Sequence, residues 1–282
     1  MVSDPVSLNS LTFSLVGPGK VGASLAHWLV SVGARLAGVA SKSSDSARIL
    51  TDTFGGYPTS SAEIESGEDD LLLIAVPDTA LEEVTLTLAR HRQAPVVLHT
   101  SGRFPGEILA PLRLGGSAIG SLHPLKAFPS VLVDPLEAKG TVFGIDGDDP
   151  ACALAERIAG GLSGTATPIP PAIRSHYHLA ATLAAGGVVT LLATAAELAE
   201  QVGLDRDVVV GYLELARNAI QQARSSDSLA AAITGPIARG HLDEYQAQID
   251  EVRALNPTLA NFLEELAKQT LHHCKKATHQ RG

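Results

Sequence analysis

Polar side chains that could move a proton or bind an oxygen follow short apolar runs at two points of the chain. His123 comes directly after the run at residues 118–122, and Ser101 comes after the run at residues 95–99. A histidine titrates near neutral pH and can act as a general acid or base. We therefore expect proton transfer at His123, with Ser101 as a second polar group. The structural alternatives are a histidine that caps its strand and a serine that serves a Thr-Ser-Gly turn.

Two further candidate sites lie in the C-terminal half. Tyr177 and His178 begin a long apolar segment with helical spacing, and adjacent residues on a helix point about 100° apart. We expect only one of them, His178, to face the reacting atoms; the alternative is a histidine satisfied within a helix interface. Arg239 follows the helix-breaking stretch 234–236 and has the planar fork that binds a carboxylate in a bidentate way. Its alternative is a buried structural arginine.

A glycine-rich stretch near the N-terminus opens the part of the chain that must position these groups. It follows the apolar run at residues 13–16 and precedes apolar residues with helical spacing. A strand, G-x-G-x-x-G and a helix in this order indicate a dinucleotide site, because the glycines allow a tight turn, close approach of the pyrophosphate and helix–strand packing. Free N–H groups at the helix N-terminus hold the phosphates. The alternative is a strand, turn and helix without a ligand. The expected contacts here are Gly17, Pro18, Gly19, Lys20, Val21 and Gly22.

The end of the second expected strand, residues 35–40, distinguishes between the two nicotinamide cofactors. Chains that bind NAD usually place Asp or Glu there for the ribose hydroxyls. This chain has Ser41, Lys42 and Ser43 instead. A cation among hydroxyl groups suits a 2′-phosphate, so the sequence predicts NADP; the alternative is that Lys42 is a solvated loop lysine. Further expected cofactor contacts at strand ends are Val76, Pro77 and Thr100.

Apolar runs alternate with helical segments over the first 170 residues. This alternation predicts an α/β fold, a Rossmann doubly wound parallel sheet with right-handed crossovers. Ligands of such sheets lie beyond the carboxyl ends of the strands, which brings Val76, Thr100 and His123 around one crevice. The expected strands include residues 35–40, 71–76, 95–99, 118–122, 141–146 and 165–169.

A proline-rich stretch at residues 168–171 marks a break in composition, and helical spacing dominates after it. We therefore predict an NADP-binding Rossmann domain over residues 1–170 and an all-helical domain for substrate binding or dimerisation over residues 171–282. The expected helices of the second domain cover about 173–202, 207–224, 243–255 and 257–275.

The composition argues against several classes of protein. The formal net charge of -9, without a Lys/Arg cluster to reverse it locally, argues against a nucleic-acid partner. Two distant cysteines and the lack of a signal-peptide pattern lead us to expect a cytoplasmic protein. The cluster at residues 272–274 lacks carboxylate neighbours, so no metal is expected. The uncharged run at residues 179–196 reaches the lower limit for a membrane span, but its many Ala, Gly and Thr residues drive insertion weakly, so no membrane is expected.

Several stretches together resemble a known family. They are residues 98–102 (LHTSG), 121–125 (SLHPL), 177–178 (YH) and 233–240 (ITGPIARG). These resemble the Rossmann-like oxidoreductases that carry the C-terminal domain of unknown function DUF2520, relatives of pyrroline-5-carboxylate reductase and of the deazaflavin-dependent NADP reductases. The resemblance covers nearly the whole chain from residue 13. It implies an NADP-binding domain and an all-helical domain that often builds a dimer.

The pairing of Ser101 with His123 and Pro124 is also similar to that of prephenate dehydrogenases, in which a Ser and a His from neighbouring strand ends hold the reacting hydroxyl. This similarity implies that Ser101 bonds the substrate oxygen and that His123 moves the proton. The sequence departs from the DUF2520 pattern at Gly186, His241 and Gln248, where Asn, Asp and His are usual. These departures leave two interpretations open, a changed substrate pocket and weakened catalysis.

These observations predict a cytoplasmic NADP-dependent oxidoreductase that forms a homodimer through its helical domain. A hydride would pass between the nicotinamide and a small carbonyl, imine or hydroxy-acid centre in the cleft between the domains. The predicted catalytic residues are His123, Ser101, His178 and Arg239. Two alternatives stay open: a non-catalytic NADP-binding sensor or scaffold, and an enzyme that passes hydride between NADP and a deazaflavin.

Overall fold

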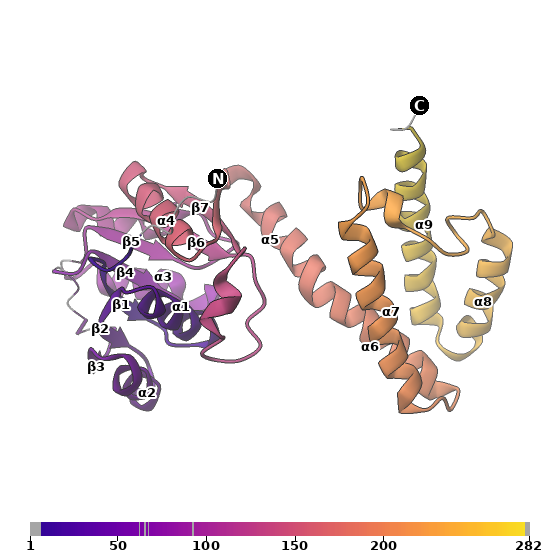
Figure 1. The fold of residues 1–282 in the computed structure, drawn as a ribbon, viewed down its shortest axis with the longest axis horizontal. Coiled ribbons are helices and arrows are strands. Elements are labelled where there is room, and N and C mark those ends of the chain that lie inside the picture. Colours follow the sequence, from indigo (N-terminus) through magenta and orange to yellow (C-terminus); the bar gives the residue numbers. More distant parts are fainter. Residues whose placement is uncertain (1–6, 62, 65, 67, 92, 280–282) are drawn as a thin grey trace. The chain divides into compact units, whose positions relative to one another are not determined.

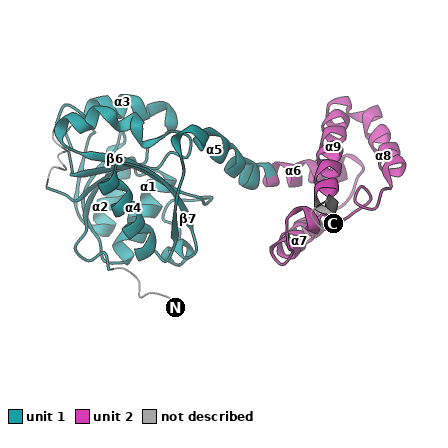
Figure 2. Ribbon diagram, turned by 90° about the horizontal axis from the view of Figure 1, so that it is seen from above, with its two compact units in different colours: residues 1–187 teal, residues 188–282 magenta. Residues whose placement is uncertain are grey.

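The structure, a computed structural model, describes residues 7–279 except 62, 65, 67 and 92. The chain divides into two compact units, residues 1–187 and residues 188–282 (Figure 2). Strands give way to helices close to the predicted domain boundary at residue 170. The division between the compact units falls later, inside a long helical segment.

The first unit is organised around one sheet, which has eight strands in the described part of the chain (Figure 1). The strand order is β3-β2-β1-β4-β5-β6-β7-β8, and the first six positions follow the order of dinucleotide-binding folds. The predicted doubly wound fold is therefore confirmed. The strands are β1 (Thr12–Val16), β2 (Arg35–Ala40), β3 (Tyr57–Thr59), β4 (Leu71–Ile74), β5 (Val96–His99), β6 (Ala118–Pro124), β7 (Val142–Gly147) and β8 (Thr165–Pro168).

The sheet departs from the predicted parallel arrangement at β7. This strand runs antiparallel to β6, with Asp146 opposite Ser121 and Gly144 opposite His123. A parallel return would need a crossover over a face of the sheet. The connection from β6 to β7 instead holds only the short 3-10 helix η2 (Pro135–Ala138), beside which Trp28 donates its indole N–H to the carbonyl of Val133 at 2.9 Å. The reversal brings the acidic side chain of Asp146 beside Ser121, in the middle of β6.

Helices cover both faces of the sheet, as Figure 2 shows. One apolar cluster joins the sheet to α1 (Lys20–Ser31), α2 (Ser44–Phe54) and α4 (Asp149–Gly161), and the other joins it to α3 (Asp78–Leu88) and the 3-10 helix η1 (Gly106–Gly115). Side chains alternate between the faces along a strand. On β4, Leu71 and Leu73 therefore enter the first cluster, while Leu72 and Ile74 enter the second. This double burial explains the uninterrupted apolar run.

A long helical segment leaves the first unit. It consists of the 3-10 helix η3 (Pro171–Ile173), α5 (Arg174–Thr182), the π-helical turn η4 (Leu183–Gly187) and α6 (Val188–Gln201). By length and composition, residues 171–201 form the one helix of the described chain that could cross a membrane. An 18-residue window within this helix has a mean hydropathy of 1.8, and none of that window is buried.

The second unit is helical. It contains α6, α7 (Arg206–Arg224), the 3-10 helix η5 (Ala230–Ala232), α8 (Leu242–Leu255) and α9 (Pro257–His279). Among its described apolar residues, the buried ones are Ala199, Ile237, Ile249 and Ala260. Large apolar side chains on α7, such as Leu213 and Leu215, are exposed in the single chain.

Candidate functional site

The glycine-rich loop between β1 and α1 has the backbone geometry of a phosphate cradle. Gly17 has φ +92°, and a Cβ atom there would lie 2.6 Å from the carbonyl oxygen of Ala75. A Cβ atom on Gly22 would lie 2.1 Å from the carbonyl oxygen of Gly17, whereas one on Gly19 would meet nothing within 4 Å. No described side chain caps the N-terminus of α1. The fold therefore requires glycine at Gly17 and Gly22. Gly19 instead borders open space, next to the free N–H groups at the start of α1.

A first cavity, of about 460 Å³, opens beside this loop. We call it the lysine cavity because Lys42 lines it at the end of β2. Ser43 does not line it and instead caps α2, since its hydroxyl accepts the N–H of Ser46 at 3.4 Å. Sequence reasoning missed three hydroxyl-bearing wall residues, Ser46, Ser61 and Thr79, whose positions depend on how α2, the following segment and α3 fold back. Predicted cofactor residues on its wall are Gly17, Pro18, Gly19, Ser41, Lys42, Val76 and Pro77.

A second cavity, of about 360 Å³, lies beyond the carboxyl ends of β4, β5 and β6. We call it the histidine cavity because His123 and His178 line it. It shares Gly19, Val76 and Pro77 with the lysine cavity, so the two are adjacent along the glycine loop. The three strand ends predicted to converge do meet here. Other predicted residues on its wall are Lys20, Val21, Thr100 and Ser101.

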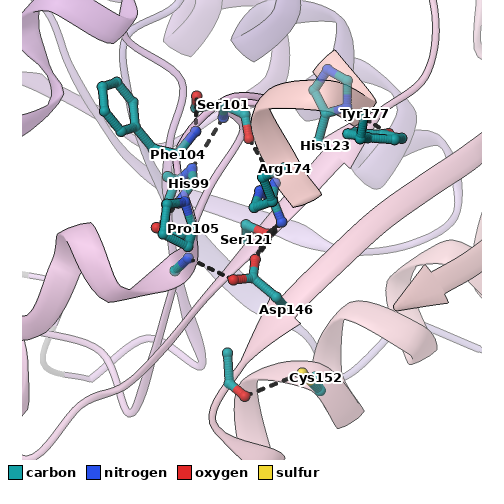
Figure 3. Close-up of polar contacts among 12 residues, drawn as sticks. His99, Ser101, Phe104, Pro105, Ser121, His123, Asp146, Cys152, Arg174 and Tyr177 are labelled. Atoms are coloured by element: carbon teal, nitrogen blue, oxygen red, sulfur yellow. Dashed lines mark hydrogen bonds and ion pairs between the residues drawn. The ribbon is translucent and has the colours of Figure 1, made fainter. Parts of the chain in front are cut away.

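His123, on the wall of the histidine cavity, forms a polar pair with Tyr177, which lies outside the lining of that cavity. Nδ1 of His123 lies 2.8 Å from the hydroxyl of Tyr177, and their rings meet edge to face (Figure 3). The sequence pattern favours His178 over Tyr177, but the structure gives this hydrogen bond to the tyrosine. The ring of His178 lies 5.9 Å from that of His123, and its buried Nδ1 has no hydrogen-bond partner among the described residues.

The electrostatics of the pair assign its protons. Burial lowers the pKa of His123 to about 4, helped by the nearby His178 and Arg174 and opposed by Asp78. Burial also raises the pKa of Tyr177, so its phenol stays protonated at neutral pH. The phenol therefore donates to Nδ1 of the neutral imidazole, and the remaining imidazole proton sits on Nε2.

Gly102 sets the distance between the two histidines and the strand end below them. A Cβ atom on Gly102 would lie 2.5 Å from Nδ1 of His178 and 2.7 Å from Nε2 of His123. Both distances are shorter than real Cβ contacts allow, so the missing side chain makes room for the two rings. Sequence reasoning treated Gly102 only as part of a turn.

A buried ion pair anchors the helix that carries Tyr177. Arg174 is only 1% exposed and pairs with Asp146 of β7. It also donates to the hydroxyl of Ser121 at 2.8 Å and to the carbonyl of Ser101 at 2.9 Å (Figure 3). Since side chains three apart on a helix share a face, fixing Arg174 at the start of α5 fixes Tyr177 over the cavity. The sequence showed both charges but not their pairing, which depends on the reversed direction of β7.

Ser101 lines the histidine cavity, but its hydrogen bonds serve the local turn. Its hydroxyl accepts the N–H groups of Arg103 at 3.2 Å and Phe104 at 3.1 Å, and its own N–H donates to Nδ1 of His99. Nε2 of His99 lies 3.1 Å from the carbonyl oxygen of Pro105, and burial lowers the pKa of His99 to about 4. Both ring nitrogens of the neutral His99 are therefore hydrogen-bonded within the turn. The substrate-binding role of Ser101 stays a prediction.

The remaining predicted site residue, Arg239, lies in the second unit. Its side chain is exposed there, in the turn before α8. Its role stays a prediction. Of the three departures from the family pattern, His241 and Gln248 lie in the second unit, at and inside α8. Gly186 lies in the π-helical turn that follows α5.

Comparisons with protein families divide the chain at an earlier point than the compact units do, between β6 and β7 of the sheet. Residues 3–124 match the Rossmann-like domain family, and residues 141–270 match the family described as Domain of unknown function (DUF2520). No match is found among curated proteins.

Solved structures resemble nearly the whole chain. One is the putative NADP oxidoreductase BF3122 from Bacteroides fragilis, with a TM-score of 0.77 and 24% identity over 94% of this chain and 100% of that one. Another is protein TM1727 from Thermotoga maritima, with a TM-score of 0.75 and 24% identity over 94% and 99%. The pyrroline carboxylate reductase of Plasmodium falciparum, solved with NADP bound, has a TM-score of 0.61 and 14% identity over 95% and 99%. The protein therefore joins a Rossmann-like domain to a C-terminal domain of the DUF2520 family.

Proposed function

We propose that this protein is an NADP-dependent oxidoreductase acting on a small carbonyl, imine or hydroxy-acid centre. The observation that carries the proposal is the adjacency of the lysine and histidine cavities, which connects the glycine loop to the His123–Tyr177 pair. The fold shared with the putative NADP oxidoreductase BF3122 from Bacteroides fragilis supports this class of reaction.

The lysine cavity and the glycine loop fit a dinucleotide phosphate. Gly19 leaves open space at the uncapped N-terminus of α1, where N–H groups and the helix dipole favour a pyrophosphate. Lys42, Ser41 and Ser46 line the neighbouring cavity and would hold a 2′-phosphate. NADP, when bound, would supply or accept the hydride.

The chain's own residues would carry the proton. In the reducing direction the substrate carbon gains a hydride, its C=O or C=N double bond opens, and Nε2 of His123 gives its proton to the oxygen or nitrogen. Nδ1 then takes the phenolic proton of Tyr177, and solvent restores the phenol. The charge of Arg174 favours the transient phenolate, because it lowers the pKa of Tyr177 against the effect of burial. Oxidation runs the same relay backwards.

The cofactor assignment is tested by thermal unfolding with NADPH and with NADH. We expect NADPH to raise the melting temperature more than NADH does at equal concentration. Lys42→Asp should weaken NADPH binding and spare NADH, while Lys139→Asp, at an exposed lysine that lines none of the described cavities, should leave both unchanged. Equal losses for the two cofactors in Lys42→Asp would contradict the 2′-phosphate role.

Turnover is tested by following NADPH absorbance across carbonyl, imine and hydroxy-acid compounds. His123→Ala and Tyr177→Phe should each lower kcat at least tenfold, as general acid–base groups do, while NADPH still raises the melting temperature. If NADPH binds but no compound is reduced by NADPH or oxidised by NADP, the proposal of an enzyme would be contradicted and a non-catalytic NADP-binding sensor would be favoured.

A further inference from the structure

A third cavity adjoins the site on the side away from the glycine loop. It has a volume of about 570 Å³, and we call it the alanine cavity because four alanines of α5 and the π-helical turn line it. It shares His123, Pro124, Lys126 and His178 with the histidine cavity and none of its residues with the lysine cavity. The three cavities therefore follow one another in the order lysine, histidine, alanine.

We propose that the alanine cavity binds the body of an apolar 2-oxo acid, or of the corresponding 2-imino or 2-hydroxy acid, whose carboxylate is held by Lys126. The proposal rests on the proposed function, because it places the reacting carbon at His123. The order of the cavities leaves the substrate only the space beyond His123 once the first two hold the cofactor.

The walls of the alanine cavity determine the chemistry of its occupant. The described lining contains no Asp or Glu, and Lys126 is its one permanently charged side chain. Polar groups are confined to the end near His123 and Tyr177 and to Thr182. A ligand that fits has an apolar body and one anionic group. The apolar lining consists of Pro124, Leu125, Ala127, Ala180, Ala181, Ala184 and Ala185.

The position of Lys126 decides where on the ligand the anion lies. Lys126 lines both the alanine and the histidine cavities, so a carboxylate bound there is close to the carbon that faces His123. This matches a 2-oxo acid, with neighbouring carboxyl and oxo carbons, rather than a chain with its carboxylate at the far end.

The ammonium group of Lys126 retains capacity for such a ligand. Its Nζ lies 2.9 Å from a carboxylate oxygen of Glu137, whose side chain is 56% exposed. An ion pair with an exposed partner contributes little to stability, and an ammonium has three N–H donors. A substrate carboxylate can therefore share Nζ with Glu137 or replace it.

The first test measures binding without turnover. Straight-chain carboxylates from butanoate to octanoate are added to the full-length protein with and without NADPH, and the melting temperature is followed. Each added methylene should tighten binding roughly three- to fourfold until the cavity is full. Alcohols of equal length should bind at least tenfold more weakly, because they lack the charge that Lys126 pairs with.

The second test uses variants and a reaction. Lys126→Ala should raise Kd for the carboxylates and KM for 2-oxo acids roughly ten- to a hundredfold, and leave KM for methyl ketones of equal length within twofold. Lys126→Arg should restore most of the affinity, and Ala181→Leu should shorten the longest chain accepted. Lys139→Ala is the matched control and should change none of these values.

The outcomes separate this proposal from the proposed function. Carboxylates that bind no better than alcohols, or that bind equally well to Lys126→Ala, would overturn the substrate site even if NADPH binds and is oxidised. Conversely, if the protein binds carboxylates through Lys126 and shows no binding of NADPH, that result would support the anion site and contradict the proposed oxidoreductase function.

Discussion

The two compact units bury apolar surface in different ways. The sheet of the first unit has a buried apolar cluster on each face, and residues of β4 alternate between the clusters. The second unit buries Ala199, Ile237, Ile249 and Ala260 among its described apolar residues and leaves large side chains of α6 and α7 exposed. A doubly wound sheet completes its core within one chain, whereas this set of helices needs another surface. We propose that a second copy of the chain supplies it.

Loss of the buried charge on β7 should give the largest effect in the first unit. Asp146→Asn keeps the shape of the side chain but leaves Arg174 charged and buried without its counter-ion, which should lower the free energy of unfolding by about 3–5 kcal/mol. Chemical denaturation measures this change. Asp148→Asn, at a partly exposed ion pair with Arg113, is the matched control and should cost about 1 kcal/mol or less. Similar losses of unfolding free energy in both variants would mean that the buried Arg174–Asp146 pair stabilises the fold no more than the partly exposed pair does.

A pH dependence of stability should follow from His123. Its pKa of about 4 in the folded chain lies below the ordinary 6.5, so the unfolded chain binds more protons between these values. The free energy of unfolding should therefore fall as the pH drops from about 6.5 to about 4, by roughly 3 kcal/mol for this group. His123→Asn should remove about half of the slope that the two buried histidines give in this window, because burial also lowers the pKa of His99 to about 4. His272→Gln, in an exposed part of α9, should leave the curve unchanged. An undiminished slope in His123→Asn would mean that His123 does not contribute to the proton uptake.

The dependence of stability on protein concentration should distinguish the second unit from the first. If two copies cover its apolar faces, each tenfold rise in protein concentration should add about 1.4 kcal/mol to the stability of the dimer. Leu213→Asp on α7 should yield monomers by light scattering, because it places a charge on a face that is 52% exposed in the single chain. Leu114→Asp, at a side chain of the first unit that is 95% exposed, should not alter the mass. Monomers at all concentrations in the unchanged protein would contradict the proposal.

The close packing of the first unit should extend to its site. Gly102→Ala would push against His123 and His178, and we expect kcat to fall about tenfold, an activation cost of about 1.4 kcal/mol, while NADPH binding persists. Gly115→Ala, where an added Cβ would meet nothing within 4 Å, should behave like the unchanged protein. Full activity in Gly102→Ala would show that the two rings can move apart at no cost.

Local patterns were enough to predict most of the fold. The range 35–40 for β2 was predicted residue for residue, because it has its own apolar periodicity and clear end signals. The short β3 and the 3-10 helix η1 were missed. A strand of two exposed residues and one half-buried residue shows no periodicity that sequence reasoning can use, and neither does a run interrupted by Pro111.

The sequence by itself determined the glycine loop, the succession of strands and the convergence of Val76, Thr100 and His123. Each of these depends on neighbours in the chain or on the rule that parallel strands end at one edge. Tertiary structure alone decided the partners of these groups. The pairs His123–Tyr177 and Asp146–Arg174 join residues 54 and 28 positions apart. They form because β7 reverses and α5 packs over the strand ends, and burial of these groups, which shifts the pKa of His123 and of Tyr177, exists only in the folded chain.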